Sequence, residues 1–301
     1  MLLSIITPIY NRENFISLLF ENVSSIKGNL EWIIVNDGST DNSDKLINKY
    51  QMEYKLNLKY QKITNGGKHR ALNYAMQYVT GDLVIVLDSD DTLSIDCYSL
   101  IKEQHSLYSS DDSIAGYIFQ KQEISSGYIQ KNFSKQRTIK ANLYEIINKG
   151  ILGDKAEVIK TNVFKEYKYP EISGEKFISE GVVWVPMGTK YKFIFVNHPI
   201  YYYEYLDGGL TKSGRSLRIK NPIGGLIHAE KYINKNFKLS LRLKYSILFN
   251  VYYNFIDKTI RRNYKKRDVL ILLTYLPSLL IYIYWKKYLK SQSKYTRTGK
   301  L

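Results

Sequence analysis

The sequence predicts an α/β fold in which a mostly parallel sheet carries helices on both faces. Over the first hundred residues, short apolar segments alternate with stretches of helical periodicity. The segment 83–87 is apolar without interruption, which is typical of a strand buried on both faces of its sheet. Strands that alternate with helices are joined by right-handed crossovers, and such connections make the strands parallel.

Each element of this part has its own signal. Leu2–Thr7 is an apolar run that ends at a proline, and it lacks a basic leader and a small-residue cleavage site. It therefore predicts a buried strand rather than a signal peptide. In Glu13–Ser25 the apolar side chains recur on one helical face. The remaining elements are strands at Glu31–Asn36, Leu58–Gln61 and Leu83–Leu87 and helices from about Ser43 and at Lys68–Val79.

Beyond residue 110 the pattern is less regular. Strands are expected at Ile114–Gln120, Glu157–Lys160 and Lys192–Val196, a helix at Asn142–Asn148, and mostly helices from Pro222 onward. We expect one large domain over residues 1–220, with halves of about 1–110 and 111–220, followed by a basic helical region over 221–301.

The positive charge is concentrated at the end of the chain. The 301 residues carry a formal charge of +16. Residues 231–301 hold 17 Lys and Arg against two acids, a balance of +15, which leaves +1 for the first 230 residues. This asymmetry predicts a polyanionic partner for the C-terminal region, either nucleic acid or anionic lipid. The single cysteine, Cys97, excludes an internal disulfide and suits a reducing cytoplasm.

An acidic motif directly follows the strand at 83–87. Asp88, Asp90 and Asp91 supply three carboxylates within four residues. Carboxylates this close repel one another unless they share a cation. Hard oxygen ligands suit Mg²⁺ or Mn²⁺, which keeps some of its waters and bridges substrate phosphates. The alternative is a solvated acidic turn that caps a following helix.

Two further motifs fall at strand ends, where parallel sheets bind their ligands. In Asn36–Asp41 a carboxylate is placed to accept from a nucleobase or ribose, although Asp-Gly is also an ordinary turn. Asn65–Asn73 is a glycine turn that opens a helix with two cations, an arrangement that suits a diphosphate. The chain has no Walker P-loop and no Gly-x-Gly-x-x-Gly, which disfavours ATPases and dehydrogenases.

Four segments in this order resemble the family 2 glycosyltransferases of bacterial surface-polysaccharide type, over roughly residues 1–215. They are Thr-Pro-x-Tyr-Asn-Arg, Val-Asn-Asp-Gly-Ser-Thr-Asp, Asn-Gly-Gly-Lys-x-x-Ala-Leu-Asn and Leu-Asp-Ser-Asp-Asp. The resemblance implies the GT-A fold for residues 1–220. It also implies an inverting transfer of a sugar from a metal-bound nucleotide-diphosphate sugar to a hydroxyl group.

The resemblance assigns roles to individual positions. The nucleotide would be held by Pro8, Tyr10, Glu13, Asp37, Gly67, Lys68, Asn73, Asp88 and Ser89, with Pro8, Tyr10 and Asp37 at the base. The metal, Mn²⁺ or Mg²⁺, would be held by Asp90, with Asp88 beside it. His198 is a candidate third ligand, and a purely structural role in its strand-like segment is the alternative.

An inverting transfer needs a general base that removes the proton of the acceptor hydroxyl. Members of the resembled family commonly place a Glu-Asp pair at a helix start before an aromatic residue. This chain departs from that pattern, because only Glu180 directly precedes Gly-Val-Val-Trp. We predict Glu180 as the base, with Glu175 in reserve. The alternative is a surface glutamate at a helix N-terminus.

Leu206–Arg215 predicts a loop between a tyrosine-rich strand and the C-terminal helices. Closing over the donor, it would bring Lys212 or Arg215 to the leaving diphosphate. The alternative is a mobile linker.

Val269–Trp285 is almost wholly apolar and has a central proline. It is shorter than the roughly 20 residues that span a bilayer. Lys and Arg on both flanks favour a helix pair that lies in the interface of an anionic membrane. The alternative is that the run packs back onto the catalytic domain.

The resemblance implies a UDP-sugar donor and a lipid-linked glycan acceptor, as in capsule, O-antigen or teichoic-type polymer assembly. With the basic C-terminal region, we expect the enzyme at the cytoplasmic face of a bacterial inner membrane and without a nucleic-acid partner. Two alternatives remain. One is a catalytically inactive membrane scaffold with the same fold. The other is a basic nucleic-acid-binding protein, which would leave the acidic motif unexplained.

Overall fold

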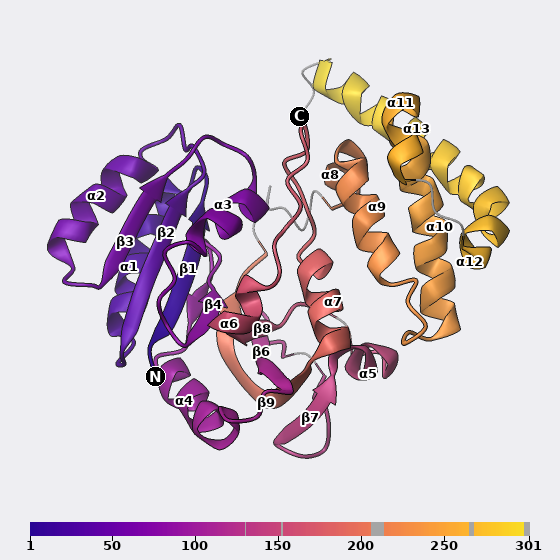
Figure 1. Cartoon of the computed structure of the whole chain (residues 1–301). Helices are drawn as coiled ribbons and strands as arrows, with labels where there is room; N and C mark the ends of the chain where they lie inside the picture. Colours follow the sequence, from indigo (N-terminus) through magenta and orange to yellow (C-terminus); the bar gives the residue numbers. More distant parts are fainter. Residues whose placement is uncertain (130, 152, 206–213, 265–267, 298–301) are drawn as a thin grey trace. The chain divides into compact units, whose positions relative to one another are not determined.

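The structure is a computed structural model that describes residues 1–129, 131–151, 153–205, 214–264 and 268–297, with backbone alone for residue 290 and residues 292–297. It separates into two compact units (Figure 1). The first unit comprises Met1–Glu171 and Pro186–Leu206, and the second comprises Ile172–Val185 and Asp207–Leu301. The domain boundary expected near residue 220 stays a prediction.

The first unit is built on one sheet. Its strands lie in the order β3-β2-β1-β4-β8-β6-β9-β5, and β7 pairs with β9. The strands are β1 (Leu3–Ile9), β2 (Leu30–Asn36), β3 (Leu58–Lys62), β4 (Leu83–Val86), β5 (Thr92–Leu93), β6 (Ile114–Glu123), β7 (Thr138–Asn142), β8 (Ala156–Lys160) and β9 (Lys192–Tyr203). The helices are η1 (Glu13–Phe15), α1 (Ile16–Ser25), α2 (Ser43–Glu53), α3 (Lys68–Ala75), α4 (Cys97–Tyr108), α5 (Leu143–Asn148) and α6 (Thr161–Lys165), while α7 (Gly181–Lys190) contributes to both units.

The N-terminal half of the sheet is parallel, as the sequence predicts. β1 pairs in parallel with β2 and with β4, and β2 pairs in parallel with β3. Helices α1, α2 and α3 connect these four strands in turn. Because the strands run the same way, the loops that follow β1, β2 and β4 and the turn before α3 meet at one edge of the sheet.

The other half corrects the expectation of a mostly parallel sheet. β8 is antiparallel to both β4 and β6, and β9 is antiparallel to both β5 and β7, while β6 and β9 are parallel. The sheet is therefore mixed. A fully buried strand has the same continuous apolar pattern in either direction, so the sequence carried no signal for this difference.

Helices cover both faces of the parallel half. On one face, Leu3 and Ile5 of β1 join a buried cluster with Phe20 of α1 and Ile101 of α4. Ile6 of β1 is equally buried but points to the opposite face, where α3 packs against β1 and β2. This two-sided covering confirms the predicted arrangement.

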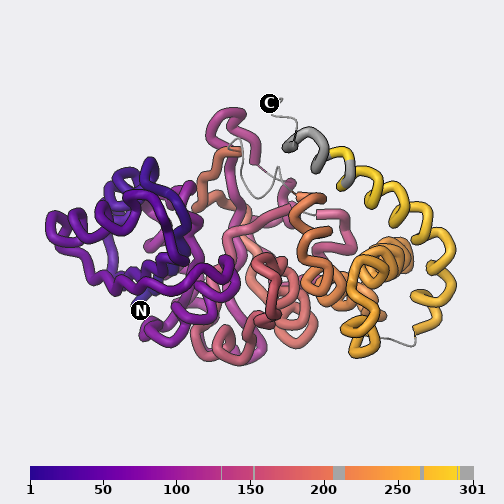
Figure 2. Tube along the Cα trace, turned by 90° about the horizontal axis from the view of Figure 1, so that it is seen from above, coloured from indigo at the N-terminus to yellow at the C-terminus, as the bar shows by residue number. Residues whose placement is uncertain are grey.

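The second unit is helical, as expected from the sequence. Its helices are α8 (Gly214–Lys220), α9 (Pro222–Lys231), α10 (Leu239–Phe255), α11 (Lys258–Arg261), η2 (Arg262–Tyr264), α12 (Val269–Leu273) and α13 (Tyr275–Arg297). Helix α13 runs beside α10 (Figure 2). Both acidic residues of 231–301 cap a helix, because Asp257 accepts from Thr259 N and Asp268 from Leu270 N. Along the described ranges, we find no helix with both the length and the apolar character required to cross a bilayer.

Candidate active site

The acidic motif lies where β4 ends, at the carboxyl edge of the parallel strands. Leu87 N still donates to Ile6 O of β1, at 2.9 Å, and the chain then turns, with Asp91 N donating to Asp88 O at 3.1 Å. Asp91 is buried, whereas the side chains of Asp88 and Asp90 are 32% and 21% exposed. Two carboxylates are therefore open to a ligand, and the third supports the turn from inside.

Cations from separate elements surround this turn. Lys68, the first residue of α3, places Nζ 2.5 Å from Asp88 Oδ1, and Arg12 places Nη2 3.4 Å from Asp90 Oδ2. Burial by itself raises the pKa of Asp88, but the charges of Lys68 and Lys121 outweigh it and hold that pKa below its usual range. Crowding of the carboxylates is thus relieved by cations of the chain itself.

Tyr201 and Lys121 are two residues of this site that the sequence did not reveal. The Tyr201 hydroxyl, on β9, accepts from Asp88 N at 2.9 Å and donates to the Asp91 carboxylate. Lys121, on β6, lies opposite Tyr201 in the sheet register, with Nζ 3.7 Å from the centre of its ring. Burial, with the charge of Asp88 second, raises the pKa of Asp91 to about 7. No local sequence signal could have found this pair, because it depends on strand pairing.

The loop after β1 and the loop after β2 are joined by hydrogen bonds. Glu13 Oε2 accepts from Asn42 N at 2.9 Å and from Asn42 Nδ2 at 2.7 Å, and Asn11 Oδ1 accepts from Thr40 N at 2.8 Å. Pro8 is buried in β1, while Tyr10 is 45% exposed. Glu13 therefore ties the two loops together, and the Tyr10 side chain is accessible to a ligand.

Asp37 organises the glycine turn before α3. Its Oδ1 accepts from Gly66 N and its Oδ2 from Gly67 N, both at 2.8 Å. Gly67 has φ +97° and Gly38 has φ +71°, conformations that favour glycine. A Cβ on Gly38 would lie 2.7 Å from Asn65 N. The second and third motifs are thus one structural unit, with the Asp37 side chain at its centre.

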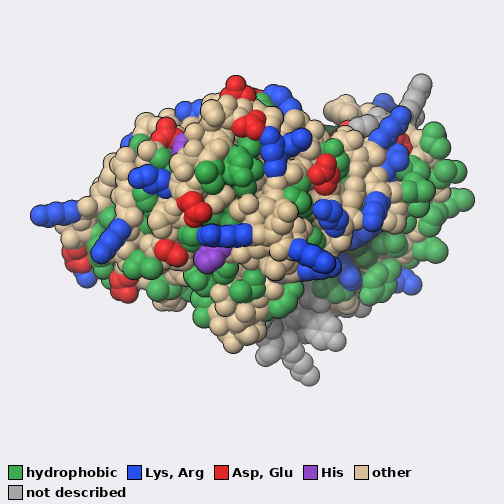
Figure 3. Space-filling view, turned by 90° about the horizontal axis from the view of Figure 1, so that it is seen from below, with side chains coloured by type: hydrophobic (Ala, Val, Ile, Leu, Met, Phe, Trp, Pro, Cys, Tyr) green, Lys and Arg blue, Asp and Glu red, His purple; other side chains and the backbone are tan. Residues whose placement is uncertain are grey.

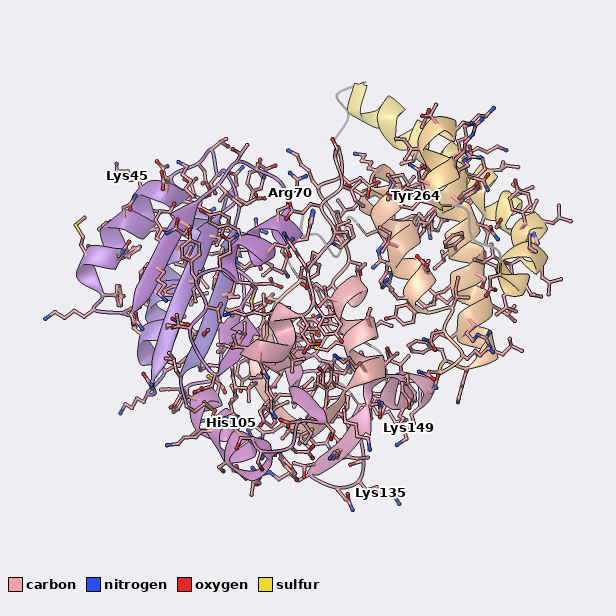
Figure 4. The ribbon with its side chains drawn as sticks, viewed as in Figure 1. Lys45, Arg70, His105, Lys135, Lys149 and Tyr264 are labelled. Atoms are coloured by element: carbon pink, nitrogen blue, oxygen red, sulfur yellow. The ribbon has the colours of Figure 1, made fainter. Side chains whose placement is uncertain are left out.

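Asn73 holds a more distant segment. Its Nδ2 donates to Tyr169 O and to Glu171 Oε1, both at 2.9 Å, and its Oδ1 accepts from Tyr169 N at 3.0 Å. Arg70, labelled on α3 in Figure 4, lies 3.9 Å from the same Glu171 carboxylate. The Asn73 side chain is engaged by protein groups, and its predicted contact with a nucleotide stays a prediction.

The predicted metal site depends on which ligand side chains lie near Asp90. Nowhere in the residues that the structure describes do three or more His, Cys, Asp or Glu side chains gather to share one ion. His198, in β9, is accordingly not brought to Asp88 and Asp90. The buried Arg12 Nε lacks a hydrogen-bond partner beside them. Two open carboxylates fit an ion of the Mg²⁺ or Mn²⁺ kind, which fills its other positions with water and phosphate oxygens.

Glu175 belongs to the second unit and is committed to a helix end. Its Oε1 accepts from Ile223 N at 2.6 Å and its Oε2 from Gly224 N at 2.7 Å, at the start of α9. The residue is only 6% exposed. Burial raises its pKa, against the effect of the two amide donors. This is a buried N-terminal cap, with both oxygens in use.

Glu180 immediately precedes α7 and is partly exposed. Its carbonyl oxygen accepts from Val183 N at 2.9 Å and from Trp184 N at 3.1 Å, so that the helix starts at this residue. The next residue, Gly181, packs so closely on α9 that a Cβ there would lie 2.6 Å from His228 Nε2. The backbone at Glu180 is thereby set against α9. Its position opposite the aspartates stays a prediction.

The two predicted diphosphate cations differ. Lys212 lies outside the described residues. Arg215, at the start of α8, is exposed and packs among aromatic rings of α13, with its guanidinium carbon 5.6 to 5.8 Å from the ring centres of Tyr284, Trp285 and Tyr288. Its predicted role at the donor stays a prediction.

Ser89 is the last predicted nucleotide contact. It lies inside the turn between Asp88 and Asp90 and is 7% exposed. The first unit therefore brings the loops with Tyr10, Asp37, Gly67 and Lys68 to the turn with Asp88, Ser89 and Asp90 at one edge of its sheet, whereas Asn73 lies farther along α3 and His198 lies in β9. Glu175, Glu180 and Arg215 belong to the second unit.

Comparisons with known proteins address the fold and family. Residues 4–167 match the model of "Glycosyl transferase family 2". Glycosyltransferase GlyA of Streptococcus pneumoniae is 23% identical over 70% of this chain and 31% of its own length. Poly(ribitol-phosphate) beta-N-acetylglucosaminyltransferase TarS of Staphylococcus aureus is 30% identical over 35% of this chain and 20% of its own length. The matched regions therefore span less than a third of either relative.

Solved structures agree on the fold. Residues 1–349 of TarS in complex with UDP-GlcNAc superpose with a TM-score of 0.61 at 18% identity, over 95% of this chain and 81% of that one. A mannosyltransferase from Pyrobaculum calidifontis in complex with GDP-Man and Mn²⁺ gives a TM-score of 0.55 at 15% identity, over 97% and 84%. With a matching family model over more than half its length and the GT-A fold, this chain belongs to glycosyl transferase family 2.

Proposed function

We propose that this glycosyltransferase moves a sugar from a UDP-sugar to a hydroxyl of a lipid-linked glycan, with inversion, in the synthesis of a bacterial surface polysaccharide. The observation that carries the proposal is the acidic turn at the end of β4 with its surrounding cations. Asp88, Asp90 and the buried Asp91 are matched by Arg12, Lys68 and Lys121. A divalent cation and a diphosphate can enter such a balanced site together, because each neutralises the other.

The donor would lie along the carboxyl edge of β1, β2 and β4. Tyr10 would stack on the base, with Pro8 below it, and the Asp37 carboxylate would take part in base recognition while it holds the glycine turn. The UDP-GlcNAc complex of TarS supports a uridine nucleotide. Lys68 and the amides at the start of α3 would face the diphosphate.

Asp90, with Asp88, would hold Mn²⁺ or Mg²⁺, and the Mn²⁺ in the mannosyltransferase complex supports this choice. Once bound, the ion would offset the charge that develops on the leaving diphosphate. Lys68, which pairs with Asp88, can turn toward that diphosphate when the carboxylate gains another cation. Arg12, whose Nε is unpaired, is the second group able to follow the charge.

Glu180 would act as the general base. It would take the proton of the acceptor hydroxyl while the new bond to the anomeric carbon forms and the bond from that carbon to the diphosphate oxygen breaks. A single displacement of this kind inverts the configuration. The structure favours Glu180 over Glu175, because a carboxylate that accepts from two helix amides at 2.6 and 2.7 Å is not available to an acceptor.

A polymer acceptor is supported by TarS, whose name specifies poly(ribitol-phosphate). We assign this chain a lipid-linked glycan, at the cytoplasmic face of the inner membrane, because 17 basic residues in 231–301 provide attraction to anionic lipid.

The test is a titration with UDP and a panel of nucleotide-sugars, with and without Mn²⁺, followed by turnover. Binding of UDP should require the ion and weaken in Asp90→Asn. Glu180→Gln should keep that binding within about twofold and lower turnover by at least about a hundredfold, since a general base contributes 10²–10⁴-fold. Glu230→Gln, a glutamate of α9 outside the site, is the control and should keep its turnover. Turnover retained by Glu180→Gln would remove that residue from the role.

A further inference from the structure

Helices α12 and α13 expose a stripe of large aliphatic side chains. Its members are Val269, Leu272, Leu273, Leu276, Leu280 and Ile283, with exposed fractions of 70%, 69%, 69%, 75%, 73% and 49%. Each member lies three or four positions from another member, so they follow one face of the pair. We refer to these six residues as the apolar stripe. A soluble monomer rarely displays so many large aliphatic groups side by side.

The face of the two helices that packs inward carries small hydroxyl residues beside Ile271, which is 6% exposed and joins a buried apolar cluster with α9 and α10. Thr274 and Ser278 are 5% and 0% exposed and satisfy their hydroxyls within the helices, on Leu270 O and Tyr275 O. Asn250 of α10 reaches across to Ile271 O at 2.7 Å. Buried small hydroxyl residues together with exposed leucines depart from the pattern of a water-exposed helix, which turns its large aliphatic residues inward. Small residues at helix contacts with apolar groups outward are typical of helices in contact with lipid.

Basic residues flank the stripe. Lys258 and Arg262 precede it and Lys286 and Lys287 follow it, and the structure describes all four as exposed. Tyr284, 60% exposed, lies at its end. In Figure 3 hydrophobic and basic side chains lie side by side at the right of the view, where the C-terminal helices lie. An apolar face bordered by cations and an aromatic ring matches the layering of a bilayer interface.

We propose that the apolar stripe is a docking surface for an anionic lipid bilayer. The stripe inserts into the leaflet that faces the protein, while the flanking Lys and Arg contact the headgroups. This deepens the proposed function, since it specifies the residues that would hold the enzyme at a lipid-linked acceptor. The run then packs one face on α10, within the C-terminal region itself, and presents the other to lipid, while its packing onto the catalytic domain stays a prediction.

The charge favours lipid over a second copy of the chain. A symmetric dimer through the stripe would bring two regions of 17 basic and two acidic residues against each other, and like charges repel. An anionic bilayer offers the opposite charge and an apolar layer together. Each Lys or Arg near such a surface adds to the attraction, which falls with salt.

The experiment measures co-sedimentation of the full chain with vesicles of phosphatidylglycerol and phosphatidylcholine, and with phosphatidylcholine alone. The wild type should bind the anionic vesicles and release with rising salt. Leu276→Gln combined with Leu280→Gln should lower the partition coefficient by at least about tenfold, because two exposed leucines no longer enter lipid. The two side chains are 75% and 73% exposed, so the fold loses little packing.

The control removes exposed apolar groups elsewhere. Met52→Gln with Leu107→Gln changes side chains that are 82% and 64% exposed in the first unit, and partition should stay unchanged. Equal binding by the stripe variant and the wild type would overturn the proposal. So would a wild-type dimer, measured by light scattering, that the stripe variant dissociates while vesicles stay unbound.

UDP binding with Mn²⁺, measured on the same proteins, separates this inference from the proposed function. It should be the same in wild type, stripe variant and control. A wild type that binds vesicles but no nucleotide would refute the donor site alone. A wild type that binds nucleotide but no vesicles would refute the docking surface alone.

Discussion

Replacing Tyr201 by phenylalanine tests whether the acidic turn is positioned from β9. The substitution removes one oxygen and keeps the ring over which Lys121 lies at 3.7 Å. The hydroxyl accepts from Asp88 N at 2.9 Å and donates to Asp91. Tyr201 is 1% exposed and Asp91 8%, so water cannot easily replace the lost group.

The magnitude follows from these contacts. In Tyr201→Phe the backbone amide of Asp88 loses its acceptor, and a buried donor left unpaired costs about 1–3 kcal/mol. The Asp91 carboxylate, already crowded by Asp88, loses its hydroxyl donor at the same time. We expect the free energy of unfolding to fall by about 2–3 kcal/mol. For a unit of this size that lowers Tm by roughly 4–12 °C. Because Asp88 and Asp90 share the loosened turn, affinity for UDP with Mn²⁺ should also fall, by about tenfold.

The assay is thermal unfolding together with calorimetric titration of UDP in Mn²⁺. Tyr202→Phe is the matched control, because neighbouring side chains of a strand point to opposite faces of the sheet. It should leave both measurements close to the wild type. A difference of 1–2 °C in Tm is roughly what a neutral surface change produces. If Tyr201→Phe and Tyr202→Phe differ by no more than this and bind UDP equally well, the Tyr201 hydroxyl does not position the turn.

Three further predictions concern stability. Glu31 is 1% exposed, and its bond to Lys59 helps to lower its pKa to about 2 against the effect of burial. Its contribution of about 3 kcal/mol to the free energy of unfolding is present above pH 4.5 and is lost as the pH falls toward 2. In Glu31→Gln the free energy of unfolding, measured with denaturant at several pH values, should therefore fall less steeply below pH 4.5. Gly38 and Gly127 both have positive φ, but only at Gly38 would a Cβ meet backbone, 2.7 Å away. Gly38→Ala should therefore lower the free energy of unfolding, measured in urea, by about 2 kcal/mol more than Gly127→Ala does. Equal losses of this free energy in the two variants would contradict the prediction. Asn250 Nδ2 donates to the backbone of α12 at 2.7 Å, so in Asn250→Leu the backbone amides of α12 should exchange hydrogen faster while exchange elsewhere stays unchanged. Unchanged protection of α12 would show that the bond is dispensable.

Much of the donor side could be predicted because its signals are local. A parallel strand followed by a polar turn delivers that turn to the carboxyl edge wherever the strand lies in the sheet. Asp37, the glycine turn and Asp88–Asp90 each directly follow or precede a predicted element, and the structure brings them together. Strand direction in the second half was not predictable, since β8 is buried at four of its five positions and a buried strand shows the same pattern in either direction.

The tertiary structure decided which residues support those motifs. Tyr201 lies 113 positions from Asp88 and Lys121 reaches the turn only through the pairing of β6 with β9. It also distinguished the two glutamates, because the cap on α9 that occupies Glu175 is formed by residues 48 and 49 positions away.

The family, the parallel half of the sheet and the motifs at its edge could be predicted from the amino-acid sequence, because these depend on short-range pattern and strand order. The sequence also shows that the last 71 residues are apolar in part and strongly basic. Which face of that apolar run is buried depends on its contacts with α10. Ile271 joins the buried apolar cluster there and Thr274 Oγ1 accepts from Asn250 Nδ2, while the leucines stay exposed; the composition of a segment does not report which side of its helix meets the neighbouring helices.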